Sequence, residues 1–99
     1  MKEFEKIRSV LSDQKEFLRN KYRIKEISIF GSVVRREEGD ISDIDILVDF
    51  SEPIGFFAFL ELEEYLEQLL GRKVDLVSRK ALKPKIGERI LKEAVSVFH

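Results

Sequence analysis

The chain has 99 residues and contains no cysteine and no tryptophan. Without cysteine it has no disulfide framework, which fits a reducing compartment. No apolar run approaches the roughly 20 residues that a helix needs to cross a membrane. The N-terminal segment is charged and periodic, unlike a signal peptide. We therefore expect a cytoplasmic protein with no membrane partner.

Neither sign of charge dominates the chain. Its 18 lysines and arginines nearly balance its 19 aspartates and glutamates, leaving a formal net charge of −1. Such a chain has no global attraction to nucleic acid, so we expect no direct nucleic-acid partner. The length predicts one domain over residues 1–99, with a core of its own but no room for a second substrate domain. The high lysine and glutamate content is typical of heat-loving organisms.

Apolar residues at helical spacing predict amphipathic helices over residues 3–20 and 56–70, and a last helix that begins at Pro84 and runs to Ala94. Strands are expected over residues 24–30, 43–50 and 73–77, and residues 95–98 can add a short edge strand. Residues 32–37 indicate a short helix that is broken at residues 38–40.

This alternation of helices and strands predicts an α/β (α+β) fold, a small mixed β-sheet with helices packed on it. The connection from Phe30 to Asp43 is too short for a full parallel crossover, which needs about a dozen residues. The first two strands are therefore antiparallel neighbours or a cramped unit. The nearly continuous apolar run in residues 43–50 suggests that both faces of this strand are covered.

Two aspartates interrupt the apolar strand at residues 43–50. Because alternate residues of a strand point to the same face, Asp43 and Asp45 are expected side by side. Two like charges held together repel each other, and a divalent cation between them relieves that repulsion. In the simpler alternative, Asp43 caps the strand entry and Asp45 faces solvent, although aspartate is disfavoured in strands.

A glycine-serine turn precedes this strand. Gly31 lets a ligand approach the main chain, and Ser32 begins a helix whose first amides lack partners, so together they favour a phosphate. Either Arg35 or Arg36 can bind a triphosphate oxygen, and a solvated helix face is an equally good interpretation of the two arginines. The simpler alternative for the turn is a strand-to-helix connection in which Ser32 is the N-cap.

A third acid, Asp75, lies within a later strand between apolar neighbours. If that strand lies beside the Asp43 strand, the carboxylate of Asp75 can point at Asp43 and Asp45, and three carboxylates can hold two Mg²⁺ ions. The alternative is a surface carboxylate on an edge strand.

Asp49 lies too far along the strand of residues 43–50 to share these ions and is assigned a structural role. His99 is expected to be a free tail.

These motifs resemble the nucleotidyltransferase superfamily related to DNA polymerase beta, and most closely its minimal nucleotidyltransferases, the MNT domain. The family signature is Gly-Ser, ten residues, Asp-x-Asp and a third acid on a later strand. The matching residues here are Gly31, Ser32, Asp43, Asp45 and Asp75, within the segments IFGSVVRRE and SDIDILVDF. The likeness covers about residues 20–98. Arg36 departs from it, because many members have a small residue at this position.

The resemblance implies a nucleotidyltransferase fold and an Mg²⁺-dependent enzyme that transfers AMP from ATP to a hydroxyl. Many small members resemble antitoxins that pair with a HEPN-domain toxin and adenylylate its tyrosine, so ATP and such a toxin are the expected partners, in a homo- or hetero-oligomer. Two alternatives are a binding module that neutralises its partner by contact alone and a small-molecule nucleotidyltransferase.

The aromatic residues Phe56, Phe57 and Phe59 are expected in the core, with a partner interface as the alternative.

Overall fold

The computed structural model describes residues 3–35 and 43–99. Their elements are α1 (Glu3–Asp13), α2 (Lys15–Tyr22), β1 (Ile24–Phe30), α3 (Ser32–Arg35), β2 (Ile44–Phe50), α4 (Phe56–Leu70), β3 (Val74–Ser78), a 3₁₀ helix (Arg79–Ala81), α5 (Pro84–Glu93) and β4 (Val95–Phe98). The predicted strands and the terminal edge strand are confirmed. The expected break at residues 38–40 and the end of the short helix at residues 36–37 lie outside the described residues.

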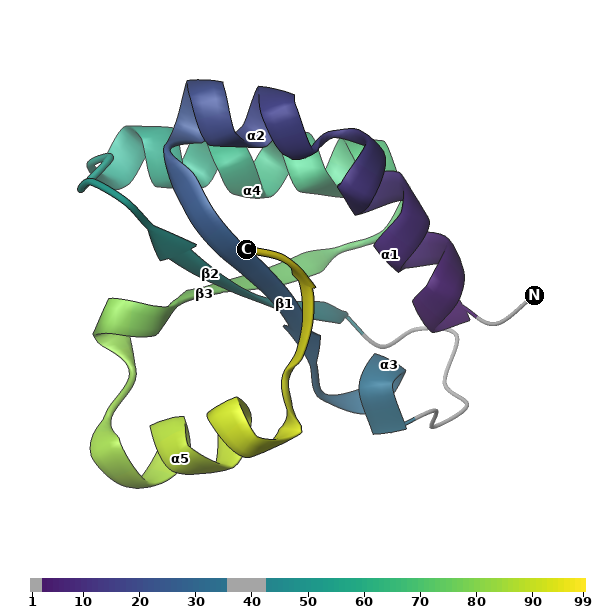
Figure 1. Cartoon of the computed structure of the whole chain (residues 1–99), viewed down its shortest axis with the longest axis vertical. Coiled ribbons are helices and arrows are strands. Elements are labelled where there is room, and N and C mark those ends of the chain that lie inside the picture. Colours follow the sequence, from purple (N-terminus) through teal and green to yellow (C-terminus); the bar gives the residue numbers. More distant parts are fainter. Residues whose placement is uncertain (1–2, 36–42) are drawn as a thin grey trace.

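The strands form one mixed sheet in the order β3-β2-β1-β4. β1 pairs antiparallel with both β2 and β4, whereas β2 pairs parallel with β3. The mixed sheet is thus confirmed, and the short connection after β1 joins antiparallel neighbours (Figure 1). β3 and β4 are the edge strands, and the longer crossover between β2 and β3 contains α4.

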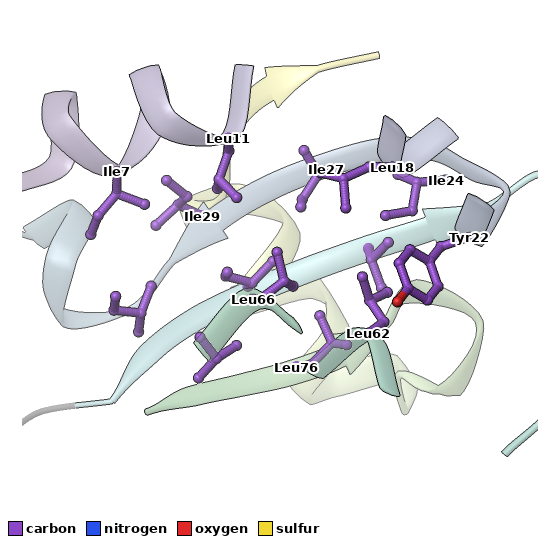
Figure 2. Packing of buried hydrophobic residues seen from close by; sticks show 14 of the residues in the cluster. Ile7, Leu11, Leu18, Tyr22, Ile24, Ile27, Ile29, Leu62, Leu66 and Leu76 are labelled. Carbon is purple, nitrogen blue, oxygen red and sulfur yellow. The ribbon is translucent and has the colours of Figure 1, made fainter. Parts of the chain in front are cut away.

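The core fills one face of this sheet, where α1, α2 and α4 cover the strands (Figure 1). Leucines of the three helices meet isoleucines and valines of the strands, as Figure 2 shows for part of the cluster. The completely buried members include Leu11, Leu18, Ile27, Ile29, Ile44, Ile46, Val48, Leu62 and Leu66. Each large apolar side chain buried in this way contributes about 1.5–3 kcal/mol, so this face holds the sheet together. Within the described part of the chain, no helix is long and apolar enough to cross a membrane.

The single helix predicted over residues 3–20 is wrong, because the structure has two helices separated at Gln14. The amide of Gln14 donates to the carbonyl of Leu11, three residues back, at 3.1 Å, and its own carbonyl accepts the first bond of α2, from Leu18, at 2.9 Å. The hydroxyl of Tyr65 also donates to the Gln14 side chain at 2.8 Å. Leu11 and Leu18 stay buried on both sides of the break, so apolar spacing alone does not reveal it.

The second face of β2 is covered only in part, which corrects the expectation of two covered faces. Leu47 is buried there, but Asp45 and Asp49 on the same face remain partly exposed. α5 lies on this side of the sheet (Figure 1) and leaves a cavity of about 250 Å³ lined by Leu47, Asp49 and Leu91 among others. The partly open face is where the sheet presents its acidic side chains.

The prediction that the aromatic residues at the start of α4 belong to the core is wrong for two of the three. Phe56 is 68% exposed and Phe57 is 83% exposed, whereas Phe59 packs against Phe50 with ring centroids 6.3 Å apart. Phe57 lies on the side of α4 that is turned away from the buried Leu62, and Phe56 lies in the first turn of the helix. The start of α4 therefore presents apolar surface.

Candidate active site

The parallel pairing of β2 with β3 brings two of the predicted acids together. Asp45 and Asp75 are direct partners in the register, between the pairs Ile44–Val74 and Ile46–Leu76. Paired residues of neighbouring strands point to the same face, so both carboxylates lie on the partly open face. Asp43 directly precedes β2 and is exposed. The third strand therefore lies where the metal hypothesis requires it.

Two glutamates of α4 hold the edge strand that carries Asp75. The amide of Val74 donates to Oε2 of Glu67 at 3.1 Å, and the amide of Leu76 donates to Oε2 of Glu63 at 3.4 Å. These contacts satisfy backbone donors that an edge strand otherwise leaves open to solvent or to another chain. They also fix the backbone on both sides of Asp75, and thereby the position from which its side chain projects.

Gly31 lies directly against the carboxylate of Asp45. Its φ is +77°, a left-handed conformation that favours glycine. A Cβ atom at this position would stand 2.0 Å from Oδ2 of Asp45 and 2.9 Å from its Cγ. Both the turn and the neighbouring carboxylate therefore require glycine, which explains why the sequence places Gly31 at the end of β1.

Gly31, Asp43, Asp45 and Asp75 together form one corner of the sheet. The electrostatics of this corner disfavour the charged form of Asp45. Burial raises the pKa of its carboxyl above the ordinary value, and repulsion from Asp75 and then from Asp43 raises it further. Arg35 opposes this rise, and Glu93 adds a smaller repulsion. A bound cation reverses the balance because it interacts favourably with all of these carboxylates at once.

Glu93 is a residue of this corner that the sequence interpretation missed. Its Oε2 accepts a hydrogen bond from the amide of Gly31 at 3.1 Å, and its Oε1 forms an ion pair with Nη1 of Arg35. Val95 of β4 pairs with Ile29 of β1. This pairing places the end of α5 beside the glycine turn. The position of Glu93, two residues before β4, points to this site only when it is known that β4 pairs with β1.

The turn itself offers a smaller phosphate cradle than the sequence suggests. α3 is a single turn in the described residues, and the amide of Arg35 closes it on the carbonyl of Gly31 at 3.1 Å. A helix this short has little macrodipole. A phosphate at this place would depend on the half-buried Ser32 and on Arg35. Arg36 lies outside the described residues.

The donor set fits Mg²⁺ when substrate phosphates share the ion. Among residues 3–35 and 43–99, no three acidic, histidine or cysteine side chains already stand as a complete ligand group. Mg²⁺ is usually held by one or two carboxylates together with substrate phosphates, rather than by a cage made of protein alone. The paired Asp45 and Asp75, with Asp43 acting on Asp45, supply hard oxygen ligands of this kind.

Two other predicted positions lie away from this corner. Asp49 is opposite Glu26 in the register of β1 and β2, and Arg79 pairs with both carboxylates at 3.9 Å and 3.8 Å. Arg79 therefore offsets their mutual repulsion, in agreement with a structural role for Asp49. His99 is not a free tail, because its backbone oxygen accepts a hydrogen bond from Arg19.

Known proteins share both the sequence and the fold of this chain. The model of the family described as "Polymerase beta, Nucleotidyltransferase" matches residues 5–99. The protein adenylyltransferase MntA of Thermococcus cleftensis is 50% identical over 93 residues, covering 94% of each chain. A chain of a toxin–antitoxin complex with AMP-PNP has a TM-score of 0.77 at 23% identity, covering 92% of this chain and 72% of that chain.

A third similar protein comes from a complex between a tri-AMPylated HEPN toxin of Shewanella oneidensis and its MNT antitoxin. The matching chain has a TM-score of 0.68 at 22% identity, covering 92% of this chain and 71% of that chain. At these identities the two structural likenesses establish the fold alone, whereas the family match and the MntA identity extend over nearly the whole sequence.

Proposed function

The chain belongs to the polymerase beta nucleotidyltransferase family, and from that premise we propose that it transfers AMP from ATP to a protein hydroxyl with the help of Mg²⁺. The proposed acceptor is a tyrosine of a HEPN-domain toxin, which makes the chain an antitoxin. The observation that carries the proposal is the direct pairing of Asp45 with Asp75 beside Gly31.

In the proposed reaction Asp43, Asp45 and Asp75 would hold the divalent ions, while Ser32 and Arg35 would bind the phosphates of ATP. When bound, Mg²⁺ neutralises phosphate charge and lowers the pKa of the attacking hydroxyl. The hydroxyl oxygen forms a bond to the α-phosphorus, the bond to the β-phosphate breaks, and pyrophosphate leaves. The carboxylate of Asp75 accepts the proton of the hydroxyl. Catalysis consists of positioning and charge neutralisation.

The choice of a protein acceptor draws on the relatives and on one surface of the chain. The MntA relative is a protein adenylyltransferase, and a structural neighbour comes from a complex with a tri-AMPylated HEPN toxin. Phe56 and Phe57 present exposed aromatic rings at the start of α4, with centroids 5.7 Å apart. Exposed aromatic residues of this kind are enriched in protein interfaces.

Label transfer from ATP tests this function directly. The chain, Mg²⁺ and a candidate HEPN-domain partner are incubated with ATP labelled at the α-phosphate. We expect the label on the HEPN chain, at tyrosine by peptide mass spectrometry, and no transfer when EDTA removes the metal. Label that transfers equally well in EDTA, or that never reaches the partner, would contradict the proposal.

Exposed Phe56 and Phe57 also favour a second candidate, in which the chain neutralises its partner by contact alone. The two functions separate in one comparison, because contact needs no catalytic carboxylate. Toxin activity that stays neutralised by the Asp43→Asn chain would favour contact, whereas restored toxin activity would favour AMP transfer.

A further inference from the structure

We propose that Glu93, the last residue of α5, is a positioning residue that places the Gly31 turn and the guanidinium of Arg35 for the triphosphate of ATP. The inference rests on the proposed function, because it assigns a part in that function to a residue outside the aspartate motif. Glu93 reaches the turn from 62 residues away in the sequence.

The geometry gives each oxygen of the Glu93 carboxylate its own donor. Oε2 accepts the amide hydrogen of Gly31 at 3.1 Å, and Oε1 pairs with Nη1 of Arg35. The first contact fixes the backbone where the chain turns from β1 into α3. The second anchors the guanidinium of Arg35, at the end of α3, through its Nη1 atom. One carboxylate therefore controls both the turn and the cation beside it.

Exposure indicates that this ion pair acts on position more than on stability. The side chain of Arg35 is 49% exposed and that of Glu93 is 25% exposed. Ion pairs with a solvent-exposed partner add little to folding free energy. A guanidinium is planar and rigid, however, so a carboxylate held at Nη1 limits the orientations that the whole group can take. Recognition of a phosphate by the planar guanidinium depends on that orientation.

The hydrogen bond from Gly31 to Glu93 also reduces the number of groups that can bind the triphosphate. The Gly31 amide donates to Glu93, so the protein itself occupies this donor. The proposed function therefore assigns the triphosphate to the hydroxyl of Ser32 and to the guanidinium of Arg35, and not to the Gly31 amide. Only Ala94 separates Glu93 from β4, which pairs with β1, so the C-terminal segment holds this end of α5 beside the turn.

The test compares Glu93→Gln with the exposed helix control Glu88→Gln. A glutamine keeps an acceptor for the Gly31 amide but loses the charge that holds Arg35. We expect the KM for ATP in the labelling assay to rise about tenfold, with a smaller change in kcat, because one charge-assisted contact to the triphosphate is misplaced. The dissociation constant of a non-hydrolysable ATP analogue, measured by calorimetry, should rise equally, and Glu88→Gln should change neither constant.

A double-mutant cycle with Arg35→Gln separates positioning from a merely structural role. If Glu93 acts through Arg35, Glu93→Gln should add little to the loss that Arg35→Gln already causes. Fully additive losses would overturn the inference. So would a Glu93→Gln chain that melts at a lower temperature but keeps the wild-type KM and dissociation constant. Wild-type protein that binds the analogue without transferring AMP would count against the proposed function alone, because the binding comparison still reports on Glu93.

Discussion

AMP transfer by the Asp45→Asn chain is expected to fall by about a thousandfold or more, because the substitution removes the central charge of the proposed metal site. Asp45 is the acid that both Asp75 and Asp43 act on, and its carboxylate lies against Gly31. Asparagine has nearly the same shape, so the fold should survive. The labelling assay measures the loss at saturating ATP and Mg²⁺.

The same substitution should leave the chain equally stable or more stable. Burial and repulsion raise the pKa of Asp45, which means that the folded state disfavours its charged form at neutral pH. A neutral asparagine removes that repulsion. Thermal unfolding should therefore show an unchanged or higher melting temperature together with lost activity, a combination that a folding defect does not produce.

Asp49→Asn is the matched control for this prediction. Asp49 lies on the same strand and the same face, but its carboxylate is near Arg79 and opposite Glu26. Its replacement should leave AMP transfer within about twofold of the wild type, with at most a small loss of stability. Equal activity of the Asp45→Asn and wild-type chains would remove Asp45 from the reaction, whatever the behaviour of the control.

Gly31→Ala is expected to cost both activity and stability. Its φ of +77° costs an alanine about 1–2 kcal/mol, and the added Cβ would stand 2.0 Å from the carboxylate oxygen of Asp45. Either the turn or Asp45 must move, so we expect a total loss of more than about 2 kcal/mol. AMP transfer should fall by at least about a hundredfold. Urea unfolding and the labelling assay measure the two effects.

Gly71→Ala separates the backbone strain from the contact with Asp45. Gly71 also has a left-handed φ, +68°, but nothing lies within 4 Å of a Cβ placed there. This control should lose only about 1–2 kcal/mol and keep wild-type transfer per folded molecule. If the Gly31→Ala chain loses no more stability and no more activity than Gly71→Ala, the missing Cβ of Gly31 is not needed to position the Asp45 carboxylate.

Local sequence patterns were sufficient for the strands. Apolar runs of the right length predict them, and alternation along the second strand predicts that Asp43 and Asp45 share one side. The helix break at Gln14 escaped this reasoning, because Leu11 and Leu18 remain buried on both sides of it. The spacing of apolar residues shows which face of a helix is buried. It does not show where a single residue interrupts the helix.

Contacts between distant segments limited the rest of the prediction. Asp75 could be placed only on the condition that its strand lies beside β2, and the parallel register meets that condition. Glu93 could not be found, because its role depends on β4 pairing with β1 beside the glycine turn. The sequence predicts Phe56 and Phe57 in the core, although the first turn of a helix can present such residues to a partner.

The most direct measurement of the central claim counts Mn²⁺ ions by electron paramagnetic resonance in the presence of a non-hydrolysable ATP analogue. The claim is that carboxylates from β2 and β3 share divalent ions with the triphosphate beside Gly31. It predicts about two bound Mn²⁺ per wild-type chain, fewer for Asp45→Asn and Asp75→Asn, and the wild-type number for Asp49→Asn. An unchanged number of ions in the Asp45→Asn and Asp75→Asn chains would contradict it.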